Sequence, residues 1–397
     1  MPRVASSTSC YTCRKRKLKC DERLPTCARC SKTGLICDRS SRLLIKRIVP
    51  GGVSITDDAP RDLLKQPHIA DLFHTYIKHL APWYDLSDRN CTFAQEAPTR
   101  ALDSPLLFAA IVAFAGCFSA RTSSSSLAIA EAYHTRCLRF LISLSPADEA
   151  VQNGTALAAT CLLRSYEILS EVEDPNRHLF GASTLLPPQT PALNDGSLRA
   201  GAFWNYLRED ITYSLIHGCP LKIEVGRCLD NAVTASNLSN AMTLLMARTI
   251  NIYFNEKEDP RDVQILKEDM MLCWHTHQPQ PFAYYHKETD DFPTIKMLTD
   301  TQVAAHHYNK VIQCMLMDQN RAGLAAEICS LAMSSLSNAV VVNAYGPICF
   351  TGQWLETASQ RNALVKWLYD TQKRTAWSVN PIIEKLGKAW GKTKTQS

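Results

Sequence analysis

CYTCRKRKLKCDERLPTCARCSKTGLIC, residues 10–37, decides the fold of the N-terminal part of this 397-residue chain. Its six cysteines follow the spacing C-x2-C-x6-C-x6-C-x2-C-x6-C. The pattern contains a repeat, since Cys10, Cys13 and Cys20 recur 17 residues later as Cys27, Cys30 and Cys37. Each C-x2-C turn points two thiols to one side, and a helix of about two turns over the next six residues returns a third thiol to the same point. The repeat therefore predicts two equivalent cysteine loops.

This spacing indicates a metal site, with a disulfide-stapled module or a chance cluster of cysteines as the alternatives. No apolar run follows Met1, so we expect no secretory leader, and in a reducing compartment a tight cysteine pattern more often binds metal. Zinc takes four ligands in a tetrahedron, so two ions need eight sulfurs unless some are shared, and six suffice if two of them bridge. The segment holds little apolar material, and zinc coordination, on the order of 10 kcal/mol, would replace the missing core. We expect the module to be unfolded without metal.

The positive charge of the chain is concentrated around these cysteines. Residues 1–50 contain 13 Lys or Arg against 3 Asp or Glu, a net charge of +10, whereas the other 347 residues contain 30 and 35, a net charge of −5. A basic end on an otherwise mildly acidic protein is typical of a protein that binds a polyanion. Five of the six residues between Cys13 and Cys20 are cations, against one between Cys30 and Cys37, so the two loops differ in task.

The cysteine pattern and its basic interval closely resemble the fungal binuclear zinc cluster DNA-binding domain. The resemblance implies two zinc ions bridged by Cys10 and Cys27. One ion would also bind Cys13 and Cys20, and the other would also bind Cys30 and Cys37. It further implies that the end of the first short helix enters the major groove of double-stranded DNA and reads a CGG-like triplet.

These implications map onto a set of cations. Arg16 and Lys17 are the expected base contacts, because Lys and Arg donate to guanine O6 and N7. Arg14, Lys15 and Lys19 are the expected phosphate contacts, and Arg29 and Lys32 are weaker candidates. A nuclear localisation patch is the alternative interpretation of this run, and both roles can coexist.

Beyond this module the sequence predicts helices almost throughout. Apolar residues recur at helical spacing on three faces: Leu72, Phe73, Tyr76 and Leu80; Leu157, Cys161, Leu162, Tyr166 and Leu169; Phe203, Trp204, Leu207, Ile211 and Leu215. Proline-containing stretches around 174–197 and 277–293 are expected to be loops. Ten further cysteines are scattered in apolar surroundings and are expected to be buried. The apolar run 106–118 is too short to span a bilayer and is expected to be a buried helix, so no membrane partner is expected.

Several stretches of this region resemble the fungal-specific transcription factor domain, which is all-helical and regulatory. They include HLAPWYD at residues 79–85, SPLLFA at 104–109, ATCLLR at 159–164 and AFW at 202–204 with REDI at 208–211. The expected fold class is therefore mostly α, with a small six-cysteine module before an all-helical domain. The expected segments are a disordered N-terminus (1–9), the zinc cluster module (10–37), a linker (38–66), the helical domain (67–391) and a disordered tail (392–397).

No catalytic motif is present, so the chain is not expected to be an enzyme. His306 and His307 adjoin on one predicted helix and diverge by about 100 degrees, which favours ordinary packing over metal binding. Glu209 and Asp210 look like part of a helix face. Four tryptophans, at 83, 204, 354 and 377, are expected in the core rather than in a ligand cage.

The sequence therefore predicts a nuclear, sequence-specific DNA-binding transcription factor of RNA polymerase II genes. The resemblance suggests control of a nutrient pathway or a secondary-metabolite gene cluster. A homodimer is possible, although the short run 44–49 is too short for a zipper, and the helical domain would bind a co-regulator or a small-molecule effector. The alternative is a zinc-containing interaction scaffold without sequence-specific DNA binding of its own. Binding to CGG-containing duplex with a steep salt dependence separates the two.

Overall fold

In a computed structural model of the chain, residues divide into two units, Met1–Gly52 and Val53–Ser397. The described residues are 12–13, 16, 18–21, 27–33, 58–123, 126–170, 195–223, 238–255, 259–277, 283–289, 291–317 and 320–392. The expected N-terminus (1–9) and almost all of the expected tail (392–397) lie outside them, as does the linker up to residue 57.

The described part of the small unit contains the short helix α2 (Ala28–Lys32) and a helical turn at Thr12 and Cys13. Its buried core consists of four cysteines, Cys13, Cys20, Cys27 and Cys30. The charged side chains described in this unit are exposed. A cluster of thiols therefore takes the place that apolar side chains occupy in an ordinary core.

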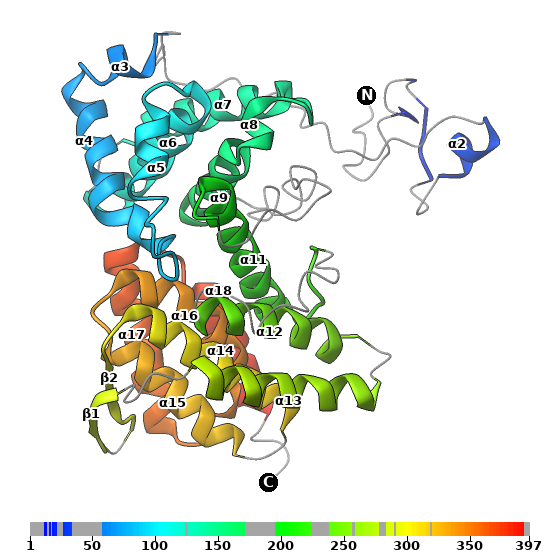
Figure 1. Cartoon of the computed structure of the whole chain (residues 1–397), viewed down its shortest axis with the longest axis vertical. Helices are drawn as coiled ribbons and strands as arrows, with labels where there is room; N and C mark the ends of the chain where they lie inside the picture. The colour runs from blue at the N-terminus through cyan, green and yellow to red at the C-terminus, as the bar shows by residue number, and fades with distance from the viewer. Residues whose placement is uncertain are drawn as a thin grey trace. The chain divides into compact units, whose positions relative to one another are not determined.

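The first half of the helical unit forms a group of helices around α6 (Figure 1). Its elements are α3 (Pro60–Leu63), α4 (Pro67–Thr75), the π-helical turn η1 (Tyr76–Leu80), the 3-10 turn η2 (Ala81–Trp83), α5 (Glu96–Ala101), α6 (Pro105–Ser123), α7 (Ala128–Ser143), α8 (Glu149–Gln152) and α9 (Thr155–Ser170). Helix α3 lies within the segment that the sequence assigns to the linker. Helices α4, α5, α7 and α9 all pack against α6.

Helix α6 is the central element of this group, because it is apolar on all sides. By length and composition it would also pass as a membrane span, but 67% of its most apolar 18-residue window is buried inside the structure. This confirms the prediction of a buried helix over residues 106–118. Phe108 and Phe114 are fully buried in it, and their rings contact aromatic rings of neighbouring elements.

The second half begins with α11, which packs against α9 of the first group and also against α12 and α16 (Figure 1). Its elements are α11 (Leu198–His217), α12 (Leu238–Tyr253), α13 (Pro260–His277), β1 (Ala283–Lys287), β2 (Thr294–Met297), α14 (Asp300–Leu316), α15 (Arg321–Ser334), α16 (Asn338–Thr351), the 3-10 turn η5 (Gly352–Trp354), α17 (Ala358–Thr375) and α18 (Asn380–Lys392). The Ser197 hydroxyl caps the start of α11, and Gly218 ends it in the left-handed conformation.

Most of the helical prediction is confirmed, and one segment differs. The mostly helical fold class and the three apolar faces are present, and seven of the nine described scattered cysteines are buried. The stretch expected to be a loop over 277–293, however, contains strand β1, which pairs antiparallel with β2. Tyr284 and Tyr285 favour a strand, but both side chains are exposed, so the strand lacks the alternation of apolar and polar residues that would identify it.

Helix α17 offers a direct test of how local sequence sets an element boundary. Thr357 forms a capping box with Gln360: the Thr357 hydroxyl accepts from the Gln360 backbone N–H at 3.1 Å, and the Gln360 side chain accepts from the Thr357 N–H. We expect Thr357→Ala to lower the free energy of unfolding of the helical unit by about 1 kcal/mol, because one helix N–H loses its acceptor. Urea denaturation followed by circular dichroism measures this. Thr357→Ser keeps the acceptor and is the control; an equal loss in both variants would show that the cap is not the cause.

Candidate metal and DNA-binding site

Three cysteines of the small unit converge on one point. The sulfur atoms of Cys13, Cys20 and Cys27 all lie within 4.8 Å of one another, and all three side chains are buried. The Cys13 and Cys27 sulfurs are 3.7 Å apart. A disulfide needs about 2.05 Å, so these two are not bonded to each other. Two sulfurs bound to the same tetrahedral zinc at about 2.3 Å lie about 3.8 Å apart, so the observed separation fits zinc ligands.

Cys27 is held in place by the start of α2. It is the N-cap residue, with an extended backbone, and its sulfur accepts from the Cys30 N–H at 3.4 Å. The Asp21 carboxylate accepts from the Ala28 N–H at 3.1 Å and joins the segment after Cys20 to the same helix start. Cys30 lies one turn into α2 with 2% of its surface exposed. The second C-x2-C turn therefore directs Cys27 and Cys30 into the cysteine cluster, as the spacing predicts.

The remaining predicted ligands, Cys10 and Cys37, lie outside the described residues. The structure therefore brings together four of the six cysteines in one buried cluster. The two residues from the first loop, Cys13 and Cys20, gather with Cys27 from the second. Thiols so close together without a disulfide between Cys13 and Cys27 fit a soft divalent metal, for which thiolate is a preferred ligand.

The cationic interval begins on a helical turn. Thr12 and Cys13 are helical, the Arg16 N–H donates to the Thr12 carbonyl at 3.3 Å, and the Leu18 N–H donates to the Cys13 carbonyl at 2.9 Å. Arg16 and Lys19 are exposed, whereas Arg14, Lys15 and Lys17 lie outside the described residues. The thiol cluster at Cys13 and Cys20 thus fixes both ends of this interval and leaves its described cations facing solvent.

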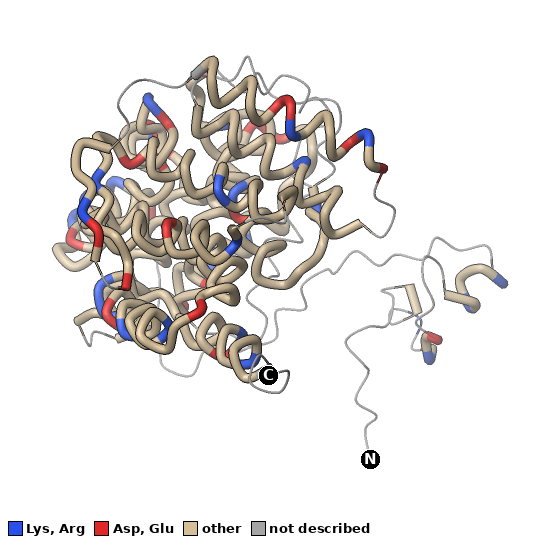
Figure 2. The backbone as a smooth tube through the Cα atoms, turned by 90° about the horizontal axis from the view of Figure 1, so that it is seen from below, with Lys and Arg blue, Asp and Glu red and all other residues tan. Residues whose placement is uncertain are grey.

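Charge is arranged differently in the helical unit. Lys and Arg lie interspersed with Asp and Glu over its helices (Figure 2). On α2 of the small unit, the exposed charged residues are Arg29 and Lys32. Together with the net charge of +10 over residues 1–50, this leaves the N-terminal unit as the basic part of the chain.

The adjoining histidines and the four tryptophans considered in the sequence pack in the interior of the helical unit. His307 is buried, its Nε2 lies 3.2 Å from the Ile328 carbonyl, and burial lowers its pKa to about 4. His306 has a pKa lowered to about 3, chiefly by burial, and its ring meets Trp274 edge-on. Both rings are therefore neutral at physiological pH. Trp83 and Trp204 are buried, and Trp354 and Trp377 are half-buried against the same core.

One interpretation of α11 is wrong. Asp210, expected on a helix face, is fully buried, and its carboxylate accepts from the backbone N–H groups of Lys222 and Ile223 at 2.8 and 2.9 Å. Arg208, the first residue of the REDI stretch, is also buried, which its membership of that stretch does not predict. Its position could have identified it: four residues after Trp204 and three before Ile211, it lies on the apolar face. A charge on an apolar face indicates either an internal partner or a binding site.

Two family models match this chain. The model of the fungal Zn(2)-Cys(6) binuclear cluster domain matches residues 8–46, and the model of the fungal specific transcription factor domain matches residues 71–259. An uncharacterized transcriptional regulatory protein of Schizosaccharomyces pombe is 34% identical over 110 residues, which are 26% of this chain and 20% of that protein. The chain therefore matches about a fifth of the length of this curated relative. The comparison with solved structures found no match.

Proposed function

We propose, from the premise that this chain belongs to the fungal Zn(2)-Cys(6) binuclear cluster transcription factors, that it regulates genes by reading a short DNA sequence with its N-terminal module. Membership of the family confirms the resemblance drawn from the sequence and makes the chain a transcription regulator, and the zinc cluster domain implies binding of zinc and DNA. We further propose how many zinc ions bind, which cysteines bind them, which residues contact the bases and which genes are regulated.

The proposed metal centre holds two zinc ions on six cysteines. Cys13 and Cys20 bind one ion, Cys30 and Cys37 bind the other, and Cys10 and Cys27 bridge both. The 3.7 Å between the sulfurs of Cys13 and Cys27 supports their sharing one ion. The Cys27 sulfur lies 3.7 Å from the Cys13 sulfur and accepts from the Cys30 N–H at 3.4 Å, and this closeness to both loops supports its bridging role. Zinc supplies structural energy here, since the core that the described residues of the module form consists of cysteines.

The proposed DNA contacts lie in the interval between Cys13 and Cys20. Arg16 and Lys17 read the bases of a CGG-like triplet in the major groove, and Arg14, Lys15 and Lys19 bind phosphates. The exposure of Arg16 and Lys19 beside a buried thiol cluster supports this assignment. A metal centre that fixes both ends of the interval limits the entropy lost when its cations settle in a groove.

The wider proposal concerns the role of the chain in the cell. We place it in the nucleus, acting on RNA polymerase II genes of one nutrient pathway or one secondary-metabolite cluster. The helical domain responds to a co-regulator or a small molecule, and the protein binds DNA as a homodimer where the half-sites are paired. Its domains are those expected from the sequence, with the DNA-binding module over residues 10–37 and the regulatory domain over 67–391. Membership of the family supports these assignments.

Titration of the full-length, zinc-loaded protein against DNA tests the proposal. Fluorescence anisotropy with a CGG-containing duplex and with a duplex of scrambled sequence gives the specificity ratio. Repeating both titrations at several salt concentrations gives the slope of log K against log salt, expected at about −0.9 for each phosphate contact. Equal affinity for both duplexes, or no dependence on salt, would favour the interaction scaffold.

Two single substitutions separate base reading from phosphate binding. We expect Lys17→Ala to cost about 1–3 kcal/mol on the CGG duplex and to relax the preference at one base pair, because a donor to a base edge is lost. We expect Lys19→Ala to weaken both duplexes alike and to reduce the salt slope by about 1. The same anisotropy titrations measure both variants. Equal losses on matched and mismatched duplexes for Lys17→Ala would remove Lys17 from the base-reading role.

A further inference from the structure

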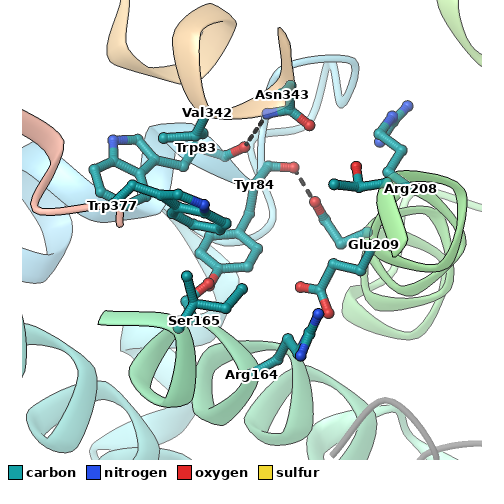
Figure 3. A pocket seen from close by; sticks show the side chains of 12 residues that line it. Trp83, Tyr84, Arg164, Ser165, Arg208, Glu209, Val342, Asn343 and Trp377 are labelled. Atoms are coloured by element: carbon teal, nitrogen blue, oxygen red, sulfur yellow. Dashed lines mark hydrogen bonds between the residues drawn. The ribbon is translucent and has the colours of Figure 1, made fainter. Parts of the chain in front are cut away.

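A polar pocket lies among the helices of the regulatory unit (Figure 3). Segments far apart in the sequence form it: the end of η2, helices α9, α11 and α16, and the residues after α17. It contains about 520 Å³ of space without atoms, part of it open to solvent. Because part of this space is open to solvent, a bound molecule need not be fully enclosed by the pocket.

One wall of the pocket is aromatic. The rings of Trp83 and Trp377 have centroids 6.4 Å apart and lie together at the left of Figure 3, with Tyr84 beside them. The backbone of this wall is fixed, because the Asn205 side chain donates to the Tyr84 carbonyl at 2.9 Å and the Asn343 side chain donates to the Trp83 carbonyl at 3.3 Å. The planes of the two tryptophan rings are tilted by 58°, so the wall offers a preformed aromatic corner against which a ring can pack.

Arg208 lies on the opposite side of the pocket from this wall (Figure 3). Only 4% of its surface is exposed. Its Nη2 donates to the side-chain oxygen of Asn240 at 2.6 Å, and its Nε has no hydrogen-bond partner in the described part of the chain. Two adjoining cavities also reach Arg208, one of them lined by Asp88 and Asn240. The guanidinium therefore borders open space, and its hydrogen-bond partner among the described residues is a neutral amide.

The charge of Arg208 is poorly balanced within the protein. The negative charge of Asp88 interacts with Arg208. The Asp88 oxygens, however, accept from the N–H groups of Asn90 and Thr92 and from the Thr92 hydroxyl. Among the described residues, no ion pair joins Arg208 to an acid. Burial lowers the pKa of Arg208, yet a guanidinium stays protonated in proteins. A buried charge without an ionic partner is costly, and an anion in the pocket would remove that cost.

The second arginine of the pocket differs. In Figure 3 the Arg164 side chain rises from α9 toward the carboxylate of Glu209 on α11. The positive charge of Arg164 lowers the pKa of Glu209, although burial dominates and raises it to about 8. Arg164 and Glu209 thus face each other, and Arg208 is left as the pocket cation without a carboxylate. Because that pKa lies above neutral pH, Glu209 is mostly protonated there, so the two arginines give the lining a net positive charge that favours an anion.

We propose that this pocket binds a small organic carboxylate with a flat aromatic body, its carboxylate on Arg208 and its ring against Trp83 and Trp377. The inference rests on the proposed response of the helical domain to a small molecule. The site needs neither the zinc module nor DNA, so its failure would leave the proposed DNA binding untouched. It names a place and a chemical class for the effector of the regulatory domain.

The test uses the full-length, zinc-loaded protein without DNA and three probes of the same size. Naphthoate carries the carboxylate, naphthalenemethanol is its neutral counterpart, and naphthylmethylammonium is a cation. Isothermal titration calorimetry measures binding, and quenching of tryptophan fluorescence reports a ring at Trp83 and Trp377. We expect naphthoate to bind at least about tenfold more tightly than the alcohol, because its contact with Arg208 is charge-assisted, and the cation not to bind. Equal affinity for naphthoate and the alcohol, or no binding of naphthoate, overturns the proposal.

Variants locate the binding site. Arg208→Met keeps the length of the side chain without its charge, and we expect it to lose at least about tenfold in naphthoate affinity while its affinity for the alcohol changes little. Arg139→Met, on the exposed side of α7, is the matched control and should bind as the unaltered protein does. The same affinity in both variants overturns the assignment. If Arg208→Met fails to fold, Trp377→Leu takes its place: removing the half-buried ring should weaken naphthoate and the alcohol alike, and unchanged binding of both overturns the site.

Discussion

Removal of zinc is expected to abolish DNA binding by the full-length protein and to leave the thermal unfolding of its helical unit unchanged. The described core of the N-terminal unit consists of four cysteines. Without metal, this described core offers no apolar contacts that would keep the unit folded. Coordination of structural zinc contributes on the order of 10–16 kcal/mol in small modules, far more than such a unit can lose and stay folded. The helical unit has its own core of apolar side chains and clusters as a separate body.

The measurement compares the protein before and after treatment with a strong chelator. Anisotropy with CGG-containing duplex follows the N-terminal unit, and circular dichroism at increasing temperature follows the helices. Added zinc should restore DNA binding, and two ions per chain should be recovered. Cys27→Ser should reproduce the effect of chelation, whereas Cys219→Ser, a half-buried cysteine after α11, serves as the control. DNA binding that persists without metal would contradict the proposed centre.

Phe114→Ala should have the opposite effect to zinc removal: it should destabilise the helical unit and leave the zinc site unchanged. We expect it to lower the free energy of unfolding of the helical unit by about 3–5 kcal/mol, because a fully buried ring is replaced by a cavity. The Phe114 ring meets those of Trp83 and Tyr84 edge-on, with centroids 5.8 and 6.2 Å away, so its loss also loosens the aromatic wall of the pocket. Urea denaturation followed by circular dichroism measures the change.

The control for Phe114→Ala is Ile142→Ala on α7, a large apolar side chain that is 50% exposed and whose removal should change stability by less than about 0.5 kcal/mol. Zinc content should be the same in both variants, since the ions bind in the other unit. A loss below about 1 kcal/mol for Phe114→Ala would show that the core around α6 collapses to fill the space.

The gathering of Cys13, Cys20, Cys27 and Cys30 follows from the sequence for a physical reason, whereas the full ligand set stays a prediction. All six cysteines fall within 28 residues, and short spacings limit the geometry of a chain so strongly that ligands can be placed by counting. The helices followed from periodicity in the same way. Phe203, Leu207 and Ile211 were expected on one face of a helix, and all three are buried in α11.

Other features needed the tertiary structure. Periodicity identified one apolar face of α9, but nearly the whole helix is buried, because the number of neighbours around a helix is not contained in its own sequence. The π-helical turn Tyr76–Leu80 continues the apolar face of α4 without a sequence marker. The pocket is the extreme case, since Trp83, Arg208 and Trp377 come from positions far apart in the chain, and only packing of the helices brings them together.

Helix α11 packs against helices of both groups. It contacts α9 on one side and both α12 and α16 on the other, and its middle turn carries Arg208 and Glu209. A packed interior transmits strain rather than absorbing it, so any displacement of that turn is felt in both groups at once. A ligand that displaced Arg208 would therefore act on the packing of both groups of helices.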